Sequence, residues 1–332
     1  MSVQETKLKA IADAIKAKLG TTSTIQASQF AAKIAEISTG IPKPSWVQST
    51  LPTSAKWRSV CYGNGKFVAV ASSSTIAAYS TDGINWTQTT LPASATWRSV
   101  CYGGGKFVAV AANDSMAACS VDGITWNRMA LSGSRNWTSV CYGAGKFVAV
   151  CSGAVLPAYS EDGDIWSSAR MPVSANWQSV CYGNGKFVAI AYGSAIAAYS
   201  TDGINWVQAT LPASALWQSV CYGNGKFVAV AKDRDIAAYS TDGINWTRST
   251  LPVNEAWVSV CYGNGKFVAV IYLGDITAYS TDGINWAQTT LLADAEEYSE
   301  WNSVCYGNGK FVAVATTSTI AAYLKDAFDE WA

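Results

Sequence analysis

The sequence contains no histidine. This absence excludes Ser-His and Cys-His catalytic dyads, histidine acid–base catalysis and histidine-ligated metal sites. Charged residues are also scarce, at 14% of the 332 residues, and 23 basic side chains balance 23 acidic ones. A chain with no net charge offers no electrostatic surface for nucleic acid, so we expect no nucleic-acid partner.

Long apolar runs are missing as well. No stretch approaches the roughly 20 apolar residues of a membrane-spanning helix, and residues 1–20 lack the apolar core of a secretion signal. We therefore expect no membrane insertion and no export by the general secretory route. The 49% of hydrophobic residues are ample for a buried core, which excludes a disordered chain.

Nine cysteines are present, and seven of them recur at one position of a repeat. These seven are Cys61, Cys101, Cys141, Cys181, Cys221, Cys261 and Cys305. One cysteine per repeat is typical of a small buried hydrophobic residue rather than a disulfide framework. A ring of metal-binding or redox thiols is the alternative, but no CxxC spacing supports it. We expect no bound metal and no cofactor.

The repeat itself determines the expected architecture. The word CYGNGKFVA begins at Cys61 and returns at the other six positions with at most one change, each time four residues after a tryptophan. The spacing is 40 residues five times and then 44, which gives seven units.

Each unit is predicted to contain four strands, because its short apolar and β-branched runs are bounded by Gly, Asn, Asp and Pro. In the first unit we expect strand A from Trp57, strand B from Lys66, strand C from Thr75 and strand D from Ile84. Four strands in about 40 residues are typical of one propeller blade. The predicted fold is therefore an all-β, seven-bladed β-propeller of four-stranded blades.

The two ends of the β region predict a closed ring. The segment 44–50 matches strand D, with Trp46 in the place of Trp86, while the last unit ends after its strand C. We expect this N-terminal strand to complete blade seven and so remove exposed sheet edges. In the A–B turn of the third unit, Ala144 replaces the usual Asn, which predicts a type I turn with a G1 bulge and a right-handed Ala144.

Residues 1–40 are predicted to form a small α-helical hairpin, since Leu8, Ile11, Ile15 and Leu19 recur at helical spacing. A hairpin of this size buries too little surface alone, so we expect an attachment or oligomerisation module. Residues 41–332 form the predicted propeller domain.

Two resemblances follow from these motifs. The words STDGINW at Ser80–Trp86 and YGNGKFVAV resemble the Asp-box of sialidase-like (BNR) propellers and the repeat of phage and bacterial propellers of unassigned function. The segment LKAIADAIKAKLG…FAAKIAEI resembles the N-terminal module of phage tail-associated proteins. Together they imply a phage tail-fibre or receptor-binding protein in the virion tail, joined to other tail proteins through residues 1–40. A homotrimer is the oligomer that this resemblance implies.

The Asp-box aspartates are interpreted as structural, because six units carry them in the same turn. They are Asp82, Asp122, Asp162, Asp202, Asp242 and Asp282. Their carboxylates are placed to bond to the local backbone.

Variation between the units is expected to mark the binding face. The A–B and C–D turns hardly vary, whereas the B–C loops, the D–A connections and the residue after the strand A tryptophan do. In a meander the B–C and D–A connections share one face. The candidate ligand-binding residues are Arg58, Arg98, Gln178, Gln218, Asn302, Tyr192, Tyr272, Lys232 and Arg234. Within the loop Lys232–Asp235 we expect the charges to pair with one another.

These residues suit a lectin-like protein that is not an enzyme and that binds a host cell-surface carbohydrate or protein. Simple drift of unrestrained loops would produce the same variation. A sialidase-like glycoside hydrolase and a structural or protein-interaction scaffold are the alternative functions. The hydrolase lacks a full arginine cluster and a distinct Tyr/Glu pair. Recent amplification or an engineered consensus would also explain such similar repeats.

Overall fold

The computed structural model describes residues 13, 16, 17, 45–291 and 299–325. The chain divides into two units, one formed by Met1–Ser45 with Asp326–Ala332 and the other by Trp46–Lys325. Most of the predicted helical hairpin at 1–40 and the segment 292–298 lie outside the described residues. The expected domain boundary at residue 40 stays a prediction.

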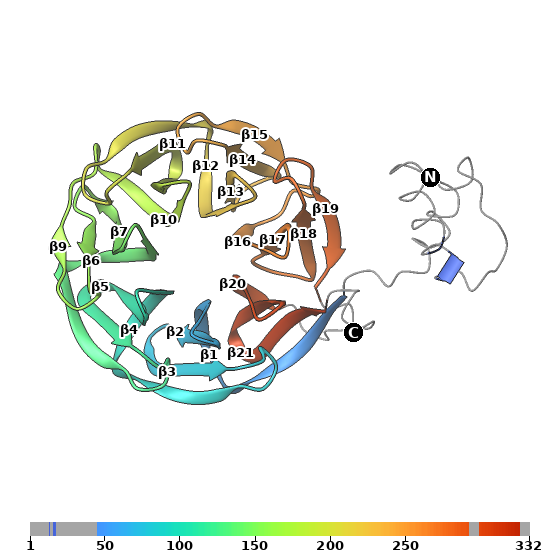
Figure 1. The fold of residues 1–332 in the computed structure, drawn as a ribbon, viewed down its shortest axis with the longest axis horizontal. Coiled ribbons are helices and arrows are strands. Elements are labelled where there is room, and N and C mark those ends of the chain that lie inside the picture. The colour runs from blue at the N-terminus through green and yellow to red at the C-terminus, as the bar shows by residue number, and fades with distance from the viewer. Residues whose placement is uncertain (1–12, 14–15, 18–44, 292–298, 326–332) are drawn as a thin grey trace. The chain divides into compact units, whose positions relative to one another are not determined.

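The unit Trp46–Lys325 is a β-propeller, in which antiparallel sheets stand around a central axis (Figure 1). Its strands are β1 (Ser45–Gly63), β2 (Lys66–Ala71), β3 (Ser74–Ser80), β4 (Thr87–Gly103), β5 (Lys106–Ser120), β6 (Asn127–Gly143), β7 (Lys146–Ala154), β8 (Ala158–Ser160), β9 (Ser167–Ser168), β10 (Ala175–Gly183), β11 (Lys186–Ser200), β12 (Val207–Gly223), β13 (Lys226–Ala231), β14 (Ile236–Ser240), β15 (Thr247–Thr250), β16 (Trp257–Gly263), β17 (Lys266–Ile271), β18 (Ile276–Ser280), β19 (Ala287–Thr290), β20 (Glu300–Gly307) and β21 (Lys310–Lys325).

The sheet β16–β19 shows the arrangement of one sequence repeat. Its four strands pair antiparallel in chain order, with β16 nearest the axis and β19 at the outer edge (Figure 1). In other repeats the ladder continues through a connection, so that β4 joins the outer strand of the first repeat to the inner strand of the second. Strand D begins at Thr87 rather than at Ile84 as predicted, because Ile84–Trp86 belongs to the preceding turn.

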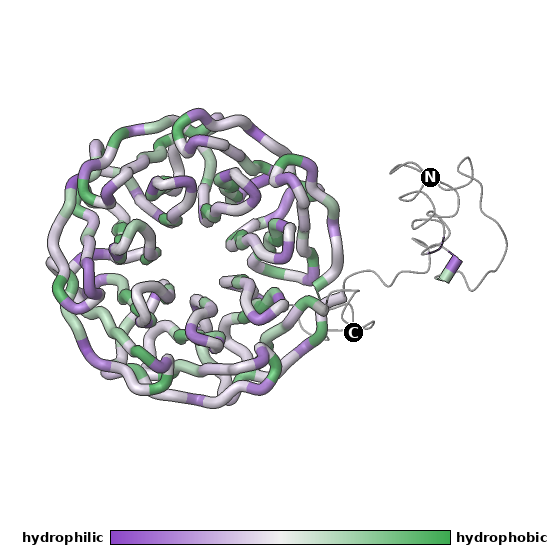
Figure 2. The backbone as a smooth tube through the Cα atoms, viewed as in Figure 1, coloured by the Kyte–Doolittle hydropathy of each residue, from purple (hydrophilic) through white to green (hydrophobic). Residues whose placement is uncertain are grey.

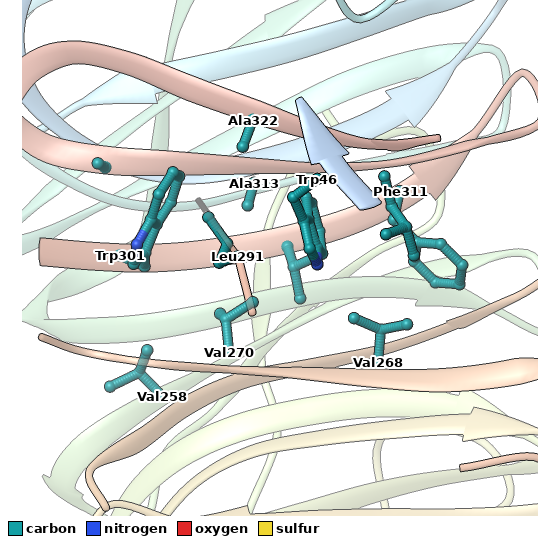
Figure 3. Packing of buried hydrophobic residues seen from close by; sticks show 12 residues of the cluster. Trp46, Val258, Val268, Val270, Leu291, Trp301, Phe311, Ala313 and Ala322 are labelled. Atoms are coloured by element: carbon teal, nitrogen blue, oxygen red, sulfur yellow. The ribbon is translucent and has the colours of Figure 1, made fainter. Parts of the chain in front are cut away.

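The N-terminal strand closes the ring as the sequence predicts. β1 pairs with β21, the last strand of the chain, and Trp46 at its start is only 7% exposed. Trp46 lies among Phe311, Ala313 and Ala322 and faces Val268 of the neighbouring sheet (Figure 3). This pairing leaves neither end of the propeller as a free sheet edge.

The core consists of the apolar layers between neighbouring sheets. One such layer joins Val68 and Val70 of β2 to Trp97 and Phe107 of the next repeat. Equivalent clusters are distributed around the whole ring, and hydrophobic residues accordingly occur in every part of it (Figure 2). Strand B is buried on both faces, which is why its sequence is continuously apolar rather than alternating.

A close contact between a glycine and a tyrosine repeats between neighbours around the axis. Gly63 packs directly beneath the ring of Tyr102, and a Cβ built on Gly63 would lie 2.0 Å from the Tyr102 Cγ. The last contact of this kind places Gly307 beneath Tyr62, and so connects the final repeat to the first. Only glycine fits such a close approach.

The A–B turns are two-residue type I′ turns, not the predicted type I turn with a G1 bulge. Asn64 and Gly65 have φ values of 47° and 73°, and strands β1 and β2 end directly on either side of them. Ala144 adopts φ 46° at the same position. The prediction of a right-handed Ala144 was wrong, because the twist of the flanking strands dictates the turn and the alanine tolerates the strain.

Candidate functional site

The connections separate onto two faces, as the alternating strand directions predict. The B–C connection of the first repeat pairs with the D–A connection, where Ser74 lies opposite Ala95. On the other face, the Asn64 side chain donates a hydrogen bond across the repeat boundary to the Val121 carbonyl in the next C–D turn, at 3.3 Å. We call the first the variable face and the second the constant face.

A β-bulge at the start of every inner strand shapes the variable face. In the first repeat Trp57 pairs with Ala71 and Ser59 pairs with Val70, so Arg58 is the extra residue. The same shift follows each of the other six strand A tryptophans. A bulge interrupts the alternation of side chains, which allows the consecutive residues Arg58 and Ser59 to face the same space.

That space is a single cavity of about 130 Å³ on the axis. Every repeat contributes its bulged residue and the serine that follows it. The bulged residues are Arg58, Arg98, Thr138, Gln178, Gln218, Val258 and Asn302. The structure thus brings together five of the predicted binding residues, and adds Thr138 and Val258.

The serines in this cavity hold the ring together. The Ser59 hydroxyl accepts a hydrogen bond from the Val100 N–H of the next repeat at 3.1 Å. The corresponding bond from the Val60 N–H to Ser303, at 3.2 Å, links the first repeat to the last. Sequence reasoning missed these serines as part of the cavity, although their invariance after a variable residue was a visible signal.

Three of the bulged side chains bond to one another or to the backbone. Arg58 Nη1 donates to the Asn302 Oδ1 at 2.9 Å, and the Asn302 amide donates to the Trp57 carbonyl, also at 2.9 Å. The Thr138 hydroxyl lies 2.7 Å from the Trp177 carbonyl. These contacts hold the side chains of Arg58, Asn302 and Thr138 in place at their bulges.

Among the described residues that line it, the cavity has two ionised side chains, Arg58 and Arg98, and no carboxylate. Burial, followed by the nearby Arg98 charge, lowers the pKa of the Arg58 guanidinium. Arg98 Nε and Gln218 Oε1 are buried and have no hydrogen-bond partner. Such atoms are costly to leave unsatisfied, so they favour a ligand with complementary groups.

The four remaining predicted residues lie in B–C loops and do not line the cavity. The Lys232 ammonium sits over the Tyr272 ring, 4.6 Å from its centre. Burial and a hydrogen bond to the Glu300 carboxylate raise the pKa of the Tyr272 hydroxyl. Arg234 is exposed, and Tyr192 is half-buried beside the Leu216 backbone.

The charges of the Lys232–Asp235 loop do not pair with one another as predicted. Asp233 accepts a hydrogen bond from the Leu216 N–H at 2.8 Å, and Asp235 lies 3.7 Å from Arg248. Neighbouring strands offer these carboxylates fixed donors, whereas partners within the loop would need long flexible side chains to be ordered.

On the constant face, the Asp-box residues form a closed local network. The Asp82 carboxylate accepts hydrogen bonds from the N–H groups of Ile84 and Asn85 and from the side chains of Ser80 and Asn85, each at 2.8 Å. Burial alone would raise the pKa of Asp82, but these hydrogen bonds outweigh it and hold the pKa well below its usual range. The carboxylate is thus engaged by its own turn, with three hydrogen bonds to Oδ1 and one to Oδ2.

The cysteines of the repeat are all free thiols and lie at the inner strands. Burial raises the pKa of the Cys61 thiol, and the neighbouring Cys305 and Cys101 raise it further. In the described part of the chain, no group of three or more Cys, Asp or Glu side chains is arranged to hold a metal ion. Among the described residues, no helix has the length and hydropathy to span a membrane.

Comparison with known proteins supports the propeller fold. No family model and no curated protein sequence matches the chain. A solved streptogramin B lyase covers 85% of this chain and 98% of its own at 10% identity, with a TM-score of 0.76. YCF48 bound to D1 peptide covers 86% and 98% at 15% identity (TM-score 0.68), and the WD40 propeller of Doa1 covers 86% and 99% at 16% identity (TM-score 0.64).

The prediction that the chain is not an enzyme was wrong, because proteins with a similar fold include enzymes. The solved propellers that it resembles include lyases, among them virginiamycin B lyase from Staphylococcus aureus at 8% identity. A propeller of this shape therefore carries catalytic sites in some proteins and binding sites in others. At such identities the likeness establishes the fold alone.

Proposed function

We propose that the chain is a recognition protein that binds a cell-surface ligand on its variable face, centred on the axial cavity. The observation that carries this proposal is the convergence of seven variable side chains, one from each repeat, on one cavity. Loop drift alone would scatter variable residues over the surface. Here a repeated bulge gathers them where a rigid scaffold can present them to a ligand.

The polar lining favours directed recognition. Guanidinium, amide and hydroxyl groups surround the cavity, and Val258 is its single apolar bulged residue. A protein ligand is supported by the YCF48 structure, in which a propeller of similar fold is bound to a peptide. A carbohydrate ligand is supported by the polar donors, while the predicted aromatic residues Tyr192 and Tyr272 stand outside the cavity.

We further propose that the ring has seven blades and that the protein belongs to a phage tail. The seven inter-repeat bonds from Val N–H groups to Ser hydroxyls support the blade count. The resemblance of residues 1–40 to phage tail modules supports attachment to other tail proteins, in a virion that delivers the propeller to a host cell. A trimer is the assembly that we expect for such a fibre protein.

The test is binding of the labelled full chain to glycan and peptide arrays and to candidate host cells. The charge reversals Arg58→Glu and Arg98→Glu should abolish binding, whereas Asn64→Asp on the constant face should leave it unchanged. Circular dichroism verifies that each variant is folded. Equal loss in all three variants would contradict the assignment of the binding face.

A further inference from the structure

The two arginines in the axial cavity, Arg58 and Arg98, include a hydrogen-bond donor that has no acceptor among the described residues. Arg58 directs one nitrogen to Asn302, but Arg98 has a buried Nε without a partner. Within the described ranges 45–291 and 299–325, no carboxylate lines the cavity. Burying a guanidinium edge without an acceptor is costly, so the cavity is complementary to an anion.

The geometry of the Arg98 guanidinium indicates which kind of anion the cavity can bind. The Arg98 Nε is itself buried, so a ligand in the cavity meets the two Nη groups of the guanidinium. A pair of guanidinium N–H groups matches the two oxygen atoms of a carboxylate.

The remaining wall distinguishes a peptide from a sugar. In the part of the chain that the structure describes, no aromatic side chain lines the cavity to serve as an apolar platform for a sugar ring. Its volume of about 130 Å³ accommodates a small terminal group rather than several sugar units. A peptide carboxylate is small and lies near backbone N–H groups.

We propose, resting on the recognition function above, that the axial cavity binds a carboxylate of a protein ligand between Arg58 and Arg98. The carboxylate comes either from a chain terminus or from an Asp or Glu side chain. Both sources present the same planar anion, and the experiment separates them.

The experiment measures binding of small probes to the full-length protein. N-acetylglycine represents a chain terminus, and the α-amide of N-acetylaspartate represents an acidic side chain. N-acetylglycinamide is the neutral control, and glucuronate represents an acidic sugar. The dependence of the thermal unfolding midpoint on probe concentration gives each apparent Kd. The NMR resonance of the Arg98 Nε–H group, assigned by its loss in Arg98→Gln, localises the binding.

We expect at least one of the two amino-acid carboxylates to shift the Arg98 resonance saturably, and the neutral amide to leave it unchanged. The tighter of the two identifies the source. Arg98→Gln should weaken binding about tenfold or more, since it removes a charge-assisted hydrogen bond. Arg128→Gln, which changes an exposed arginine on β6, should bind like the unmodified protein.

Three results would overturn the inference. They are no saturable binding of either carboxylate, binding that Arg98→Gln does not weaken, and tighter binding of glucuronate than of both peptide probes. If the arrays show ligand binding that depends on the variable face while the carboxylates fail to bind, only this inference fails. If neither is observed, the proposed recognition function fails with it.

Discussion

The constant face and the variable face are built from the same strands, yet they use their side chains differently. On the constant face, the Asp82 carboxylate accepts hydrogen bonds from its own turn, and the Asn64 side chain donates one to the next repeat. On the variable face, Arg98 and Gln218 retain unpartnered atoms. Residues whose bonds define the fold are repeated, whereas residues outside those bonds are free to differ.

The contrast is sharpest within one pair of neighbours in the chain. Ser59 bonds to the next repeat and is repeated in every unit, while Arg58 beside it changes from unit to unit. Both line the same cavity, so exposure to the cavity does not decide which one varies. The difference lies in whether the ring needs the side chain to hold adjacent sheets together.

The largest effect that we expect comes from the repeated glycine beneath the tyrosine. Gly63→Ala would place a Cβ 2.0 Å from the Tyr102 Cγ and force adjacent sheets apart. We expect a loss of about 1–3 kcal/mol or more in the free energy of unfolding, measured by urea denaturation. Gly65→Ala is the comparison, because nothing lies within 4 Å of its added Cβ and its loss reports only the cost of alanine at φ 73°, about 1 kcal/mol. A loss at Gly63 no larger than at Gly65 would show that the contact with Tyr102 does not set the cost.

Acid should act mainly through the constant face. Hydrogen bonds lower the pKa values of the Asp-box carboxyls in the folded protein. Their stabilisation is therefore complete above the unfolded pKa of about 3.9 and is lost as the pH falls through the lower folded values. We expect the unfolding midpoint to drop below about pH 4. Replacing all six aspartates with Asn should flatten this dependence, and an unchanged slope would contradict its assignment.

One Asp-box substitution should lower stability without changing recognition. Asp82→Ala removes the acceptor for the N–H groups of Ile84 and Asn85, and we expect a loss of about 1–2 kcal/mol. Ligand binding to the variable face should stay the same. Reduced binding by a folded Asp82→Ala protein would show that the two faces are coupled.

The strained turn of the third repeat offers an improvement on the constant face. Ala144 has φ 46°, where alanine is disfavoured and asparagine is tolerated. Ala144→Asn should raise the free energy of unfolding by about 0.5–1 kcal/mol and supply the cross-repeat hydrogen bond that Asn64 makes. Thermal denaturation measures the change. A lower midpoint would mean that the third repeat has adapted its neighbours to alanine.

The smallest effect on stability is expected on the variable face. Gln178 lines the cavity, and Gln178→Ala should change the free energy of unfolding by less than about 0.5 kcal/mol. The same variant should bind the ligand of the intact protein more weakly on the arrays. A destabilised protein with unaltered binding would reverse the contrast between the faces.

Much of this structure could be predicted from the sequence because the same local pattern recurs in every repeat. The recurring Trp and Gly-Lys-Phe words predict the inner strands, and the match between Trp46 and Trp86 predicts the closing strand. Five cavity residues were found because they vary at one fixed position. These successes depend on local patterns that each repeat solves in the same way.

Other features depend on how strands pair and twist and on where loops lie, which the sequence of one repeat does not reveal. The bulge at Arg58 appears only when β1 and β2 are paired, and it places Ser59 in the cavity as well. Tyr192 and Tyr272 were grouped with the cavity because they share its face, yet their loops hold them outside it. Ala144 was misjudged since intrinsic preference was given more weight than the twist of the flanking strands.

The bulge has a consequence for how such a protein can change. In each repeat, one bulged residue faces the cavity and contributes little to folding, while the residues on either side of it stabilise the sheet. Ligand preference can therefore shift by successive point mutations, each of which leaves a foldable chain. The ring therefore provides a set of independent positions on which selection can act.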